Sequence, residues 1–155
     1  MDVFELIPLQ MQNTQALSEV RECNEYSAAF GLRLSESAVK DLVAARGEAL
    51  RNTGRVEFGG GILPKLIYAV CDSPFIRQDN YETTLAELQE AFYVFKNESN
   101  DTLTDDELIE KMTAVFNGCA QGCAELLSQM SVQELERCAD KKFDPQGAEG
   151  NGALS

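Results

Sequence analysis

Apolar residues recur at intervals of three or four along most of this chain, which is the spacing of one face of an α-helix. The clearest stripe consists of Tyr81, Thr84, Leu85, Leu88, Phe92 and Phe95. Turn and capping residues separate successive stripes, and the whole pattern predicts six or seven helices. The expected helices cover roughly residues 13–30, 35–53, 62–71, 79–96, 104–117, 119–130 and 131–141.

Several of these helices have recognisable ends. Asn13 or Thr14 is expected to cap the first helix, and Gly31 to end it. Ser35 is expected to open the second helix, and Gly54 to end it. Thr104 and Glu107 have the spacing of a capping box, in which the side chain of each residue accepts a hydrogen bond from the backbone N–H of the other. The pattern therefore marks boundaries as well as helical segments.

Helices joined by short connections predict an all-α fold, a compact bundle of six or seven helices in one domain. One glycine-rich irregular segment, near residues 55–64, interrupts the helices. It begins with four alternating polar and apolar residues, too few to form a sheet without a partner strand. Residues 1–141 are predicted to form the helical domain, and 142–155, rich in glycine, a flexible tail.

The charge balance excludes some partners and leaves others open. The chain has 155 residues, with 26 acidic and 13 basic side chains and a net charge of −13. A field of this sign repels nucleic acids and anionic lipid surfaces, so we expect no nucleic-acid partner and no membrane association. No apolar run approaches the roughly 18 residues of a membrane-spanning helix, and no signal peptide is visible, which favours the cytoplasm.

Histidine is absent and cysteine is sparse, which narrows the chemistry further. Without histidine, the chain cannot form a Ser-His or Cys-His nucleophile pair or a histidine-ligated metal site. Cys119 and Cys123 share a face if residues 119–130 are helical, but two thiols alone do not make a zinc site. An odd count of 5 cysteines argues against a disulfide framework. We expect the cysteines to pack as small apolar side chains, with no metal and no cofactor.

Specific strings in the middle of the chain suggest a family. They are Gly-Arg-Val-Glu-Phe-Gly-Gly-Gly-Ile-Leu at 54–63, Cys-Asp-Ser-Pro at 71–74 and Phe-Lys-Asn-Glu-Ser at 95–99. In these strings the chain resembles an uncharacterised bacterial family, a domain of unknown function from anaerobic Gram-positive bacteria. The resemblance implies a bacterial, cytoplasmic protein and implies no activity.

The run Gly59, Gly60 and Gly61 is the first candidate for binding chemistry. Backbone amides that follow a glycine-rich turn and enter a helix can hold an anion, and Arg55 and Lys65 lie on either side. The run matches neither the phosphate-binding loop nor the dinucleotide-binding fingerprint. Alternatively, the glycines allow positive φ angles or a close approach of two helices.

A charged residue inside an apolar stripe is the second candidate. Arg46 lies on the apolar face of the helix expected at 35–53. If it is buried it needs a carboxylate partner, and Glu57 and Asp72 are the candidates. Together with Arg55 and Lys65 they could form a polar pocket around the glycines. Alternatively, Arg46 extends along the edge of the stripe into solvent.

The segment that begins at Lys96 has part of the spacing of a calcium-binding EF-hand loop. Glu107 falls at the twelfth position, where a calcium ligand is expected. However, Lys96 occupies the first ligand position, and Asp101 replaces the glycine that the turn requires. The capping box alone explains Thr104 and Glu107, so calcium binding is disfavoured.

Two functional hypotheses follow, and neither fixes a substrate. In the first, the chain is a non-enzymatic protein-interaction or regulatory module, whose helices leave a groove or a dimer face for a protein partner or a second copy. In the second, it binds or transforms a small anionic ligand at Gly59–Gly61. Arg55 and Lys65 would then hold the anion, and Glu57 or Asp72 would act as the base.

Overall fold

The structure is a computed structural model that describes the backbone of residues 3–140 and the side chains from residue 14 onward. Within that range it contains seven α-helices, one 3-10 turn and no strand, which confirms the predicted all-α bundle. The α-helices are α1 (Val3–Ser27), α2 (Glu36–Thr53), α3 (Leu63–Val70), α4 (Tyr81–Glu98), α5 (Asp105–Asn117), α6 (Ala124–Ser128) and α7 (Val132–Asp140). The predicted tail, 142–155, lies outside the described residues.

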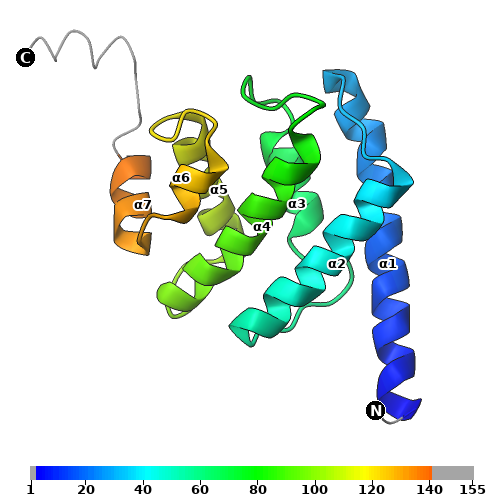
Figure 1. The fold of residues 1–155 in the computed structure, drawn as a ribbon. Helices are drawn as coiled ribbons and strands as arrows, with labels where there is room; N and C mark the ends of the chain where they lie inside the picture. The colour runs from blue at the N-terminus through cyan, green and yellow to red at the C-terminus, as the bar shows by residue number, and fades with distance from the viewer. Residues whose placement is uncertain (1–2, 141–155) are drawn as a thin grey trace, which may run out of the picture.

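The helices form two layers (Figure 1). α2 and α4 run side by side in front, α3 and α5 lie behind them, α1 borders one edge and α6 and α7 the other. α2 and α4 are parallel, because hydrogen bonds join Gln89 to Leu42 in their middle parts and Asn97 to Thr53 at their ends. Two neighbouring parallel helices need a crossing connection, which α3 and its flanking loops supply.

α3 lies in the centre of the bundle and packs against α1, α4 and α5. Leu63, Leu66, Ile67 and Val70 are almost fully buried. The opposite side of the helix is open, since Tyr68 is 48% exposed. α3 is thus amphipathic, with one side open to solvent.

The predicted helix ends are mostly confirmed. Ser35 caps α2 by accepting a hydrogen bond from the Ala38 N–H, and Gly54 ends it with a φ of 69°. Thr104 and Glu107 form the complete capping box of α5. No helix in residues 3–140 combines the length and the apolar character that a bilayer crossing requires.

Two predicted boundaries are wrong. α1 begins at Val3, so Asn13 and Thr14 lie inside the helix and do not cap it. The helix predicted from Cys119 starts only at Ala124, because the chain turns at Gly122, whose φ is 84°. Phe75 fills the space that a Cβ at Gly122 would occupy, so tertiary packing requires glycine at this turn.

Candidate functional site

The glycine-rich loop, residues 55–62, joins α2 to α3 and is anchored from below by a buried ion pair. Arg46 of α2 is 5% exposed, and its Nε donates to Glu57 Oε1 at 2.9 Å. The Tyr93 hydroxyl of α4 donates to the same oxygen at 2.5 Å. Of the two carboxylates that the sequence offered to Arg46, the structure selects Glu57. Glu57 therefore connects the loop to both front helices.

The side chains of Arg46, Glu57 and Tyr93 are largely buried, and this burial changes the pKa of the phenol. Burial, followed by the hydrogen bond to the Glu57 carboxylate, raises the pKa of Tyr93 far above its usual range. Tyr93 thus remains a hydrogen-bond donor at any physiological pH. The buried guanidinium, carboxylate and phenol satisfy one another, which is what a buried charge requires.

The start of the loop is tied to the end of α4. Arg55 donates to Asn97 Oδ1 at 2.7 Å and to Asp101 Oδ1 at 2.6 Å. Asn97 in turn donates to the Thr53 carbonyl, and Arg55 holds the pKa of Asp101 below its usual value. Two nitrogens of the Arg55 guanidinium, Nη1 and Nη2, therefore already donate to side chains of the same chain.

Lys96 explains why the calcium-like spacing after α4 does not indicate calcium. Its ammonium is nearly buried and donates to the Leu103 carbonyl at 2.8 Å. It also lies 2.9 Å from Asp105 Oδ1 and 3.8 Å from Asp101 Oδ1. The Lys96 ammonium of the chain itself therefore lies among the oxygens of this loop. Among the residues described, no three histidine, cysteine or acidic side chains form a group that could hold a metal ion.

Gly59 and Gly60 pack against α1, and the Gly60 amide already has an anionic partner. The Gly60 N–H donates to Glu19 Oε1 at 2.9 Å, and Gln15 holds the other carboxylate oxygen of Glu19. Gly59 and Gly61 have φ angles of 57° and 60°. The positive φ angles bear out one explanation of the glycine run from sequence, whereas the close contact here is between a loop and one helix rather than between two helices.

Lys65 and Asp72, the remaining candidates, lie apart from the buried pair. Lys65 is exposed and pairs with Asp106 of α5 at 2.8 Å, which raises its pKa. Asp72 is exposed beyond the far end of α3. The structure thus gathers Arg46, Glu57 and the glycines, and leaves Asp72 outside this cluster.

Sequence reasoning missed the three carboxylates and the phenol that pair with residues in and around the loop. They are Glu19, Tyr93, Asp101 and Asp106. Each is separated from its partner by more than 35 positions along the chain, so no local spacing signals the pairing. The hypothesis of an anionic ligand at Gly59–Gly61 stays a prediction, and such a ligand would have to displace Glu19.

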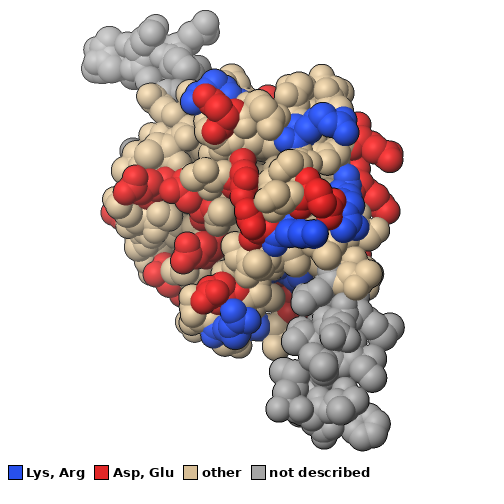
Figure 2. All heavy atoms as spheres, turned by 45° about the vertical axis from the view of Figure 1, so that its right-hand side comes forward, with Lys and Arg blue, Asp and Glu red and all other residues tan. Residues whose placement is uncertain are grey.

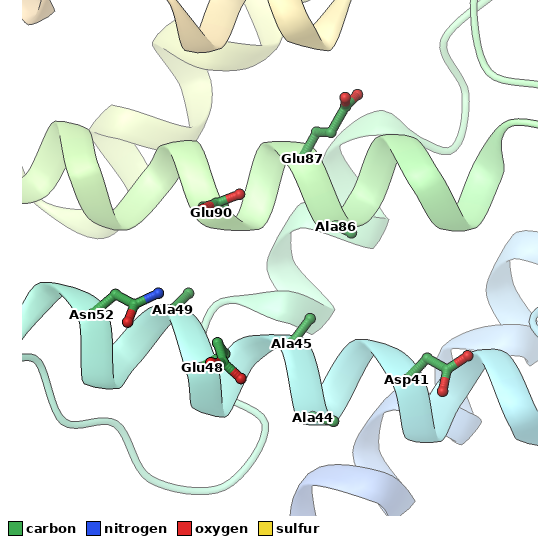
Figure 3. Close-up of a pocket in the computed structure, with 9 residues that line it drawn as sticks. All are labelled: Asp41, Ala44, Ala45, Glu48, Ala49, Asn52, Ala86, Glu87 and Glu90. Carbon is green, nitrogen blue, oxygen red and sulfur yellow. The ribbon is translucent and has the colours of Figure 1, made fainter.

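A second feature, the α2–α4 groove, lies on the front of the bundle (Figure 3). It has a volume of about 460 Å³ and lies between the two parallel helices. Its lining residues are Asp41, Ala44, Ala45, Glu48, Ala49, Asn52, Ala86, Glu87 and Glu90. Four of the nine are alanines, so the groove is floored by small apolar side chains.

The rim of the groove is acidic. Asp41 and Glu48 lie on α2, and Glu87 and Glu90 on α4 (Figure 3). Glu48 makes an exposed ion pair with Arg51 at 3.4 Å. The other three carboxylates have no hydrogen bond or ion pair with any residue that the structure describes. No basic residue lines the groove, so three of its four carboxylates remain without a partner among the described residues.

The hollow continues across α4. A neighbouring depression of about 290 Å³ shares Glu87 and Glu90 and extends to Val94 and to Ser128 of α6. Val94 is 40% exposed. Figure 2 shows basic side chains only at separate positions on the face displayed, most of them beside acidic ones. That face therefore carries no continuous basic area.

The sequence contains a signal for this groove that we did not use. On α2 the acidic and small residues Asp41, Ala45, Glu48 and Asn52 follow one another at helical spacing. They form a stripe beside the buried stripe of Val39, Leu42 and Val43. A short side chain, Ala45, among the polar residues of this stripe was the available sign of a hollow.

The cysteines are only partly as expected. Cys23 and Cys71 are buried and free, which confirms their packing role. Cys119 and Cys138 form a disulfide with a Cα–Cα distance of 6.4 Å, which the odd cysteine count had disfavoured. Cys123 is exposed and caps α6 by accepting from the Leu126 N–H. The pairing was missed because the turn at Gly122 separates Cys119 from Cys123 and directs Cys119 toward α7.

Comparison with known proteins places the chain without assigning an activity. No curated protein and no solved structure matches it significantly. The model of the family of unknown function DUF6323 matches residues 19–144. This stretch includes the glycine-rich loop and both helices of the groove. Since the match covers well over half of the chain, the protein belongs to the DUF6323 family.

Proposed function

We propose that this protein is a non-enzymatic interaction module that binds a basic amphipathic helix of a partner protein in the α2–α4 groove. One observation carries the proposal: the groove combines an alanine floor with an acidic rim, three of whose four carboxylates are unpaired among the described residues. An apolar groove between helices is a common docking place for an amphipathic helix, whose apolar side chains enter the groove. The charge of the rim specifies lysine or arginine on the flanks of that helix.

The dimensions of the groove suit a short helical segment. From Asp41 to Asn52 the α2 rim is about 16 Å long, or about three turns of a helix. Alanine side chains allow a second helix to approach closely, because they fill little of the space between the two axes. A partner helix of three turns can therefore place apolar residues over Ala45 and Ala86 and basic residues beside Glu48 and Glu90.

The cytoplasm of a bacterium is the proposed setting, in keeping with the resemblance noted from the sequence. An anionic small-molecule ligand is the less supported alternative. Arg46, Arg55 and Lys65 already pair with carboxylates of their own chain, and Gly60 already holds Glu19. The groove has the opposite property, because its charges remain available after folding.

A synthetic peptide provides the test. The probe is an amphipathic peptide of about 14 residues, with leucines at helical spacing and lysines elsewhere. We expect binding by isothermal titration calorimetry that weakens as salt is added. The same peptide with glutamate in place of lysine should not bind. The charge-reversed variant Glu87→Lys/Glu90→Lys should lose about tenfold or more in affinity for the lysine peptide.

The matched control reverses two acids away from the groove. Asp72 and Glu110 are exposed and have no hydrogen-bond or ion-pair partner among the described residues. The variant Asp72→Lys/Glu110→Lys changes the net charge equally and should leave affinity nearly unchanged. If both double variants weaken binding alike, the peptide senses only the overall negative charge, and the groove is not the docking site.

A further inference from the structure

Three half-exposed aromatic rings form a cluster, here called the aromatic face, where the end of α1 meets α3. They are Tyr26 of α1, Phe30 of the following 3-10 turn and Tyr68 of α3, with exposures of 42%, 45% and 48%. The ring centroids of Tyr26 and Tyr68 are 4.7 Å apart, and those of Tyr26 and Phe30 are 5.6 Å apart. The rings therefore support one another while each keeps a surface open to solvent.

The aromatic face is held in place by the core beneath it. Cys23, one turn before Tyr26 on α1, is 2% exposed, and Ile67, beside Tyr68 on α3, is fully buried. The rings thus project from rigid helices that pack against each other. Little side-chain entropy would be lost when a partner binds to rings that are already ordered.

Two carboxylates without partners border the aromatic face. Glu22 precedes Tyr26 by four residues on α1 and so shares its side of the helix. Cys23, burial and Glu22 all raise the pKa of Tyr68, which is consistent with a Glu22 carboxylate near the rings. Glu25 is exposed beside Tyr26. Neither glutamate has a hydrogen bond or ion pair with a described residue, and the nearby Arg21 is engaged with Glu36.

We propose that the aromatic face binds an arginine side chain of a partner protein. The faces of aromatic rings attract cations, and a planar guanidinium can stack on a tyrosine while it donates to a carboxylate. The uncompensated charge of Glu22 and Glu25 favours a cation over a neutral or anionic partner. Lysine fits less well, because a strongly hydrated ammonium cannot stack in this way.

This inference is independent of the groove, because α2 and α4 contribute nothing to the aromatic face. A second copy of the chain is a less suitable occupant, since it also carries a net charge of −13. A phosphate-bearing partner would meet Glu22 and Glu25 and be repelled. The observations therefore favour a protein segment with an exposed arginine.

Solution NMR with a short peptide tests the proposal. The probe is acetyl-Gly-Arg-Gly-amide, which is too short to span the groove, compared with the same peptide containing lysine. The chain has 4 tyrosines, and Tyr81 and Tyr93, at 1% and 0% exposure, serve as internal references. We expect saturable shifts of the Tyr26 and Tyr68 ring signals with the arginine peptide, and about fivefold weaker binding of the lysine peptide.

Neutralising the two carboxylates separates site binding from general attraction. The variant Glu22→Gln/Glu25→Gln should weaken binding of the arginine peptide about fivefold, whereas Glu110→Gln/Glu125→Gln, at exposed positions on α5 and α6, should not. Tyr68→Leu should abolish the preference for arginine. Equal shifts with both peptides, or equal losses in both double variants, would overturn the proposal. Failure of the lysine–leucine peptide to bind the groove has no bearing on this result.

Discussion

The glycine-rich loop and the α2–α4 groove both have several charged residues, but the charges around the loop are paired in the folded chain and most of those on the groove are not. In and around the loop, Arg46 of α2, Arg55 and Lys65 of α3 each pair with a carboxylate of the same chain, and the Gly60 amide donates to Glu19. On the rim of the groove, three of the four carboxylates have no hydrogen bond or ion pair with a described residue. The loop is therefore internally neutralised, whereas the groove keeps its charge for a partner.

This contrast shows what a charge cluster in a sequence can and cannot indicate. Charges that fold into ion pairs stabilise or specify the structure, and they are poorly placed to bind a ligand. Charges that remain unpaired beside an apolar floor contribute to recognition. If the loop is structural and the groove is not, substitutions in the buried part of the loop should reduce stability the most.

Breaking the buried pair should have the largest effect. Glu57→Ala leaves the Arg46 guanidinium and the Tyr93 hydroxyl buried without their partner, which should cost about 3–5 kcal/mol in free energy of unfolding. Urea denaturation measures this. The double variant Arg46→Met/Glu57→Met removes both charges and should recover most of the loss. A loss below about 1 kcal/mol in Glu57→Ala would show that the pair is not structural.

Adding one methyl group to the loop should have the next largest effect. Gly61→Ala forces a Cβ into the Glu57 carboxylate at a φ of 60°, which should cost about 2–3 kcal/mol. Gly47 offers a matched control, since its Cβ would lie 3.8 Å from the nearest atom within helix α2. Gly47→Ala should stabilise the protein by about 1 kcal/mol. Equal melting temperatures for the two variants would contradict the packing described.

Alkaline pH should weaken the fold through its buried tyrosines. Burial raises the pKa of Tyr81 to about 12, whereas an unfolded tyrosine ionises near pH ~10. Because the folded pKa is the higher one, the stabilisation is complete below about pH 10 and is lost as the pH rises through 12. Tyr81 alone should account for about 2 kcal/mol of the loss that urea denaturation measures by pH ~11.5. Tyr81→Phe should reduce that loss, and Tyr26→Phe, at an exposed tyrosine, should not.

The smallest effect on stability is expected at the exposed Lys65, which lies in the first turn of α3 just after the loop. Lys65 and Asp106 form an ion pair with side-chain exposures of 51% and 80%. Such pairs are screened by water and contribute little to stability. Lys65→Met should therefore leave the melting temperature almost unchanged. A drop comparable to that of Glu57→Ala would mean that the loop depends on its surface charges as well as its buried ones.

Local features of the fold could be predicted from the sequence, and non-local ones could not. The Thr104–Glu107 capping box and the helix stop at Gly54 depend on residues within one turn, and both are confirmed. The start of α6 depends on Phe75 packing against Gly122, far away along the chain, so the predicted helix from Cys119 was too long. Periodicity describes a helix face but not what covers it.

The same distinction applies to the candidate sites. The sequence showed that Arg46 would need a carboxylate if buried, and it named Glu57 among two candidates. It could not show that Tyr93 joins them or that Glu19 reaches Gly60, because those contacts depend on how α4 and α1 pack. The groove was missed for a related reason: it exists only because α2 and α4 lie side by side.

The most direct test of the central claim is an alanine-methyl NMR titration with the lysine–leucine peptide. We expect saturable shifts of the methyl signals of Ala44, Ala45 and Ala86, which line the groove, while the amide signals of Gly59 and Gly60 remain unchanged. Shifts confined to the glycine amides, or spread evenly over the protein surface, would contradict the claim that the groove is the docking site and the loop is structural.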